Sequence, residues 1–127
     1  MTVTTTGMSA AIQGLREALE ASRTPGATPE SWRWLVRLKM AGLRDALDAE
    51  ASIADEGWLA AREGSVLRER SALLSRLGAL GPQVMESPAV EEVRRALERL
   101  LTDIAHHVQR LHDIAYDHVE LELGGSE

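Results

Sequence analysis

The sequence predicts an all-α protein, an up-down helical bundle of three long helices plus a short N-terminal helix, with the last helix the longest. Apolar residues recur at spacings of three and four along several stretches, which is typical of amphipathic helices. These positions hold mainly Leu, Val, Ile and Ala, and aromatic residues make up only 3% of the chain. Helix start signals and clusters of Pro and Gly divide the 127 residues into segments that fit one domain.

The N-terminal part is expected to contain a tail and a short helix. We predict a disordered Thr-rich tail over residues 1–8, a single domain over 9–123 and a flexible tail over 124–127. The first helix is predicted over 9–22. One stripe of this helix carries Ile12, Leu15 and Leu19. Residues 23–30, RTPGATPE, hold two Pro and one Gly and are therefore expected to be a linker.

A second helix is predicted to start at Thr28, Pro29 and Glu30. Thr can cap a helix, Pro fits the first helical position, and Glu favours the positive end of the helix dipole. The main apolar stripe that follows is Trp32, Val36, Met40, Leu43 and Leu47. Trp34 and Leu38 lie on nearly the opposite side of this helix. We expect the first helix to cover them, and another subunit is the alternative.

The helical pattern weakens around Gly57, so we expect a break there and a third helix over residues 59–80. A single helix over residues 29–78 would be about 75 Å long and would need a partner along its whole length. We therefore favour two helices. The signals that end the third helix are Gly78, Gly81 and Pro82.

The last helix has the strongest pattern in the chain. Ser87 and Pro88 form its start signal, with Glu91 and Glu92 in the first turn. Its two heptad seams are Val90, Leu97, Ile104, Leu111 and His118, and Val93, Leu100, His107, Ile114 and Leu121. Five heptads predict a helix of up to about 36 residues, and residues 119–123 (VELEL) could also form a short strand. Because this helix is longer than the stripes that face it, we expect its end to project or to pair with another subunit in a homodimer.

Charge and composition limit the partners and the compartment. The net charge of −6 argues against nucleic acid as the main partner, because neutralising phosphates requires a cationic surface. The chain has no Cys and no apolar run of the roughly 20 residues that a membrane span requires. The N-terminal sequence has no signal-peptide pattern, so we expect a cytoplasmic protein that does not bind membranes. The single lysine, Lys39, among many arginines is typical of a high-GC bacterial genome.

All four histidines lie within residues 106–118, which is the one chemically suggestive region. His107 and His118 are about three turns apart and point the same way as the core seam. The candidate ligands for a divalent transition metal are His107, His118, Asp103 and Glu122. No second helix supplies a histidine, and Glu50 and Glu63 are not paired with the cluster by any pattern. We therefore favour polar seam histidines that are hydrogen-bonded to Asp or backbone groups. The alternatives are a metal site shared across a dimer and, less favoured, a metal site formed within one chain.

The sequence gives no support for an enzyme. The histidines have no Ser or Cys nucleophile nearby, and the glycines lack the spacing of a phosphate-binding loop. We expect a non-catalytic scaffold or regulator without a cofactor, which acts by self-association and by binding another protein. The candidate interaction residues are Trp34, Leu38, Leu111, Ile114 and Leu121.

Overall fold

The protein is an all-α bundle. The computed structural model describes residues 2–21, 26, 28–54 and 64–125, with side chains over 7–21, 26, 28, 30–49 and 64–114. These residues form four helices and no strand: α1 (Thr2–Ala21), α2 (Pro29–Ala54), α4 (Gly64–Glu86) and α5 (Val90–Gly125). With 36 residues, α5 is the longest helix, as the sequence predicts.

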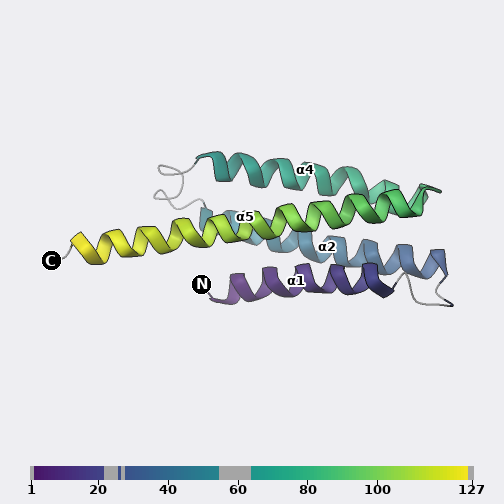
Figure 1. The fold of residues 1–127 in the computed structure, drawn as a ribbon, viewed down its shortest axis with the longest axis horizontal. Coiled ribbons are helices and arrows are strands. Elements are labelled where there is room, and N and C mark those ends of the chain that lie inside the picture. Colours follow the sequence, from purple (N-terminus) through teal and green to yellow (C-terminus); the bar gives the residue numbers. More distant parts are fainter. Residues whose placement is uncertain (1, 22–25, 27, 55–63, 126–127) are drawn as a thin grey trace.

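Successive helices run in opposite directions (Figure 1). α1 packs against α2 and α5, and α4 packs against the same two helices, so each helix has two antiparallel neighbours. Because α2 and α4 run antiparallel, one uninterrupted helix over residues 29–78 is excluded. The break predicted at Gly57 itself lies outside the described residues.

The core is built from the predicted stripes of all four helices. Every stripe residue predicted for α1 and α2 is buried, and so are the central seam residues of α5. The side chains with no exposed surface include Leu15, Val36, Leu43, Leu47, Leu97, Leu100 and Ile104. Such a core rests on aliphatic side chains, which pack between helices in well-defined rotamers.

α1 begins earlier than the sequence predicts. The helix starts at Thr2 rather than at residue 9, and Met8 is buried in the core. The reason is spacing, since Met8 lies one turn before Ile12 and so extends the apolar stripe of this helix. The low helix propensity of the threonines hid this continuation.

The start of α2 is as predicted. The Thr28 hydroxyl accepts a hydrogen bond from the Ser31 amide at 3.3 Å, and the Thr28 carbonyl accepts one from the Trp32 amide at 3.1 Å. The first bond satisfies an amide group that the first turn of a helix leaves without a partner, and the second is the first backbone hydrogen bond of the helix. In the preceding linker, Gly26 has a φ of 91°, a conformation that favours glycine.

The predicted end of α4 is wrong, because the helix continues through Pro82 to Glu86. Pro lacks the amide hydrogen of a helical hydrogen bond, but tertiary contacts offset this loss. Val84 is fully buried. The Arg33 guanidinium, from α2, donates hydrogen bonds to the carbonyl oxygens of Val84 at 2.8 Å and Ser87 at 2.7 Å. These contacts hold the last turn of α4 in place.

α5 extends well beyond the ends of the other helices (Figure 1). Its predicted start is supported by a hydrogen bond of 3.1 Å from the Ala89 amide to the Ser87 hydroxyl. The helix runs to Gly125, so residues 119–123 are helical and do not form a strand. Across the part of the chain that the structure describes, no helix is long and apolar enough to cross a membrane.

Candidate functional site

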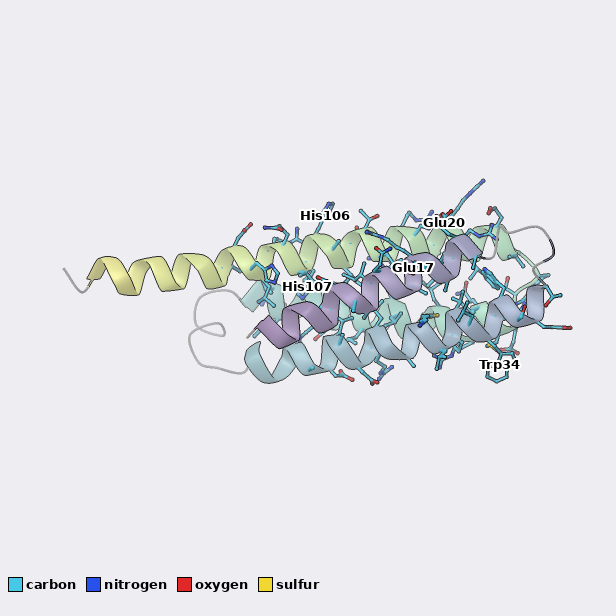
Figure 2. The ribbon with its side chains drawn as sticks, turned by 90° about the horizontal axis from the view of Figure 1, so that it is seen from below. Glu17, Glu20, Trp34, His106 and His107 are labelled. Atoms are coloured by element: carbon cyan, nitrogen blue, oxygen red, sulfur yellow. The ribbon has the colours of Figure 1, made fainter. Side chains whose placement is uncertain are left out.

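His107 is a buried polar residue in the seam of α5. Its side chain has no exposed surface, and its Nδ1 lies 2.7 Å from Oε1 of Glu69 on α4. Figure 2 shows His107 directed into the bundle and the neighbouring His106 directed outwards. Because a carboxylate can only accept, Nδ1–H of His107 is the donor.

Arg110, one turn after His107, completes this cluster. Its Nε donates to Oε1 of Glu69 at 3.3 Å, and its second terminal nitrogen forms an ion pair with Oε2 of Glu69. Burial raises the pKa of the Glu69 carboxyl, but the hydrogen bonds and charges of His107 and Arg110 outweigh burial and leave that pKa below its ordinary value of 4.5. The ionised carboxylate therefore joins α4 to α5.

Of the four candidate metal ligands, only Asp103 and His107 have described side chains, and each is bonded to a different residue of α4. Asp103 forms an ion pair of 2.8 Å with Arg76 on α4. The side chains of His118 and Glu122 lie outside the described residues, as do those of Glu50 and Glu63. Within the described ranges, no group of three or more His, Cys, Asp or Glu residues could hold a metal ion.

Glu69, the hydrogen-bond partner of His107, was not predicted from the sequence. It lies three residues after Val66 and four before Leu73, both of which are buried. A charged residue at this spacing interrupts the apolar stripe of α4 on the side that faces the core. The sequence therefore contained one indication of this pair: a charged residue in the apolar stripe of α4 and a histidine in the seam of α5.

The outer face of α2 carries exposed apolar side chains. Trp34 is 68% exposed, Leu38 is 67% exposed and Leu35 is 38% exposed. Figure 2 shows Trp34 pointing away from the bundle. The expectation that the first helix covers Trp34 and Leu38 is therefore wrong, because α1 packs against the side of α2 that carries the main stripe.

The other predicted interaction residues lie towards the end of α5. Leu111 and Ile114 are half-buried, and the Leu121 side chain lies outside the described residues. Ile114 lines an open hollow of about 290 Å³ between α4 and α5, together with Glu69 and Arg110. This hollow borders the buried cluster.

Two features of the molecule can thus be compared as functional candidates, the buried His107 cluster and the exposed face of α2. The His107 side chain has no surface open to a substrate. The Glu69 and Arg110 side chains are partly exposed but are paired with each other, so the cluster connects α4 to α5. Comparison with known proteins finds no family model, curated protein or solved structure that matches the chain. The function must therefore be inferred from these two features.

Proposed function

We propose that this protein is a non-catalytic helical-bundle scaffold or regulator of the cytoplasm, which self-associates as a homodimer and binds protein through the outer face of α2. The observation that supports this role is the exposure of Trp34 and Leu38, which lie one turn apart. Single exposed apolar side chains are common on protein surfaces. Here a Trp and two Leu side chains adjoin one another, and Trp is enriched at the energetic centres of interfaces.

The charge of the protein agrees with a protein partner better than with nucleic acid. The net charge is −6, and a nucleic-acid partner needs a cationic surface. Arg76 and Arg110 form ion pairs with carboxylates of the same chain. Such mixed charge is typical of a solvated helix surface.

The test is the mass of the protein in solution, measured by sedimentation equilibrium over a range of concentrations. We expect a concentration-dependent dimer for the unmodified protein and a largely monomeric species for Leu38→Glu. Thr102→Glu is the matched control, because Thr102 is exposed on a different helix, α5, and is not part of the outer face of α2. A protein that is monomeric at every concentration, or a dimer that Leu38→Glu leaves intact, would contradict the proposal.

Metal binding by His107 and His118 is the competing proposal. The hydrogen bond from His107 Nδ1 to Glu69 is compatible with it, because a histidine that binds a metal through Nε2 commonly donates Nδ1–H to a carboxylate. The test is elemental analysis of untagged protein purified without chelator. Stoichiometric metal that is lost in both His107→Ala and His118→Ala would favour this proposal over the first one.

A further inference from the structure

The groove between α2 and α4 contains a hollow of about 330 Å³. Its base is apolar, because the buried side chains of Met40 and Leu77 line it. Three exposed charged residues of α2, which are Arg37, Arg44 and Asp45, line it as well. An apolar base with a few charged groups is typical of small-ligand sites, and the volume lies at the lower end of their range.

The two arginines of this hollow are not neutralised by a carboxylate. Among the residues that the structure describes, Arg37 and Arg44 form no hydrogen bond or ion pair with another side chain, and Asp45 pairs with neither. A shortage of acidic residues is not the reason, because the chain has 20 Asp and Glu against 14 Lys and Arg. By contrast, Arg76 and Arg110 each pair with a carboxylate of another helix. Two cationic groups and one carboxylate leave the hollow positive in a protein whose net charge is −6.

Two glycines of α4 give the guanidinium groups their place. The guanidinium carbon of Arg37 lies 3.4 Å from where a Cβ of Gly81 would stand. A terminal nitrogen of Arg44 lies 4.0 Å from the corresponding point at Gly78. Cβ positions three residues apart on a helix are about 5–6 Å apart, whereas Cα atoms seven residues apart, like those of the two arginines, are about 10.5 Å apart. The guanidinium groups thus lie against points that are about half as far apart as the Cα atoms that carry them.

We infer that this hollow binds a phosphate group of a small soluble molecule, held between Arg37 and Arg44. A guanidinium group suits phosphate because its planar fork can donate two parallel hydrogen bonds to phosphate oxygens. The apolar base excludes water from one side of the hollow and so strengthens the attraction between opposite charges. The site lies on the side of α2 that faces α4, so the inference does not depend on the proposed self-association.

The residues of the hollow also limit the kind of ligand. A carboxylate has only two oxygens, which one guanidinium fork occupies, whereas a phosphate monoester has three acceptor oxygens and can bond to both arginines. Asp45 can accept a hydrogen bond from a hydroxyl or amino group of the same ligand. Its negative charge would repel a second phosphate, so a monophosphate is favoured over a polyphosphate.

The first test is an NMR titration of the isotope-labelled full chain with inorganic phosphate and, separately, with acetate at constant ionic strength. We expect saturable binding of phosphate, about tenfold or more tighter than that of acetate. Arg37→Gln and Arg44→Gln should each weaken phosphate binding by about tenfold or more, because each removes a charged donor. Arg95→Gln, at an exposed position of α5, is the matched control and should bind phosphate as the unmodified protein does.

Two further variants test the hollow itself without removing an arginine. Gly78→Leu fills part of the hollow and has a higher helix propensity, so it should fold and lose phosphate binding. Asp45→Asn removes a repulsive charge and should bind inorganic phosphate several-fold more tightly. Circular dichroism would verify that the variants retain their helices.

The outcomes decide the site and the source of the phosphate. Binding that survives Gly78→Leu or both arginine substitutions would overturn the site, and equal affinities for phosphate and acetate would overturn the ligand class. Sedimentation with vesicles that contain phosphatidylglycerol distinguishes a soluble phosphate from a lipid headgroup. The inference expects the protein to stay in the supernatant. Sedimentation with the vesicles that Arg37→Gln abolishes would overturn the soluble ligand in favour of a lipid.

Discussion

The guanidinium of Arg94 on α5 lies over the indole of Trp32 on α2, with its central carbon 5.9 Å from the ring centroid. Both side chains are buried, and Arg94 also forms an ion pair with Glu91. An arginine above a tryptophan face is attracted by the electrons of the ring. This contact connects two helices that are not neighbours around the bundle.

Trp32→Phe should be tolerated. The Trp32 Nε1 is buried and has no hydrogen-bond partner among the described residues, so Phe removes an unsatisfied polar group while keeping a ring beneath Arg94. We expect the free energy of unfolding to fall by less than about 1.5 kcal/mol. Trp32→Ala should cost about 3–5 kcal/mol, because it leaves a cavity. Urea unfolding measures both, and equal losses for the two variants would show that the ring itself contributes nothing.

Arg33 should stabilise the end of α4 through its two bonds to backbone carbonyls. We expect Arg33→Ala to lower the free energy of unfolding by about 1.5–3 kcal/mol, the range for hydrogen bonds that involve a charged group. Arg33→Lys should lower the free energy of unfolding by less, because the ammonium group keeps a charged donor. Some stability should still be lost, because lysine lacks the planar fork that reaches both carbonyls. The control is Arg95→Ala, an exposed residue of α5, which should change stability by at most about 0.5 kcal/mol. An Arg33→Ala variant as stable as this control would contradict the expected role of Arg33.

His107→Ala should be strongly destabilising, whereas His106→Ala should not. The first variant creates a cavity and removes the donor to Glu69, for an expected loss of about 2–4 kcal/mol in unfolding free energy. His106 is exposed, so its loss should stay within about 0.5 kcal/mol. The two neighbouring positions form a matched pair for chemical denaturation. Similar losses of unfolding free energy for the two variants would show that burial of His107 in the seam contributes nothing to stability.

Glu69 should make stability depend on pH in the acid range. Its carboxyl has a pKa below 4.5 in the folded protein, so its stabilising contribution is present above the unfolded-state pKa and is lost as the pH falls through the folded-state pKa. Glu69→Gln removes this dependence. We expect the difference in unfolding free energy between the two proteins to shrink as the pH is lowered from about 5.5 to about 3. A difference that is constant over this range would contradict the depressed pKa.

Periodicity predicted the fold and the core because burial repeats with the helix turn. The stripe of α2 and the seams of α5 could be read directly, and Thr28 marked the start of α2. The end of α4 could not be predicted, since Pro82 is tolerated only through Val84 and the contacts of Arg33 from another helix. Sequence spacing within one helix contains no information about such contacts.

The same limit applies to the candidate site. His107 was predicted as a polar seam residue, but its partner Glu69 is on another helix and is neither the Asp nor the backbone group that was expected. Trp34 and Leu38 were correctly placed opposite the main stripe of α2. The sequence could not show whether α1 covers them, because both sides of α2 are apolar enough to pack against another helix.

The contrast between Trp32 and Trp34 also gives the molecule an optical property. Two indoles two residues apart lie in opposite environments, one in the aliphatic interior beside a guanidinium and the other facing water. Emission from the water-facing indole is open to collisional quenching by iodide or acrylamide, and any protein that covers the ring shields it. In a chain whose third tryptophan, Trp58, is replaced by Phe, Trp34 is an intrinsic fluorophore at the surface where assembly is proposed, and occupancy of that surface can be followed without a dye.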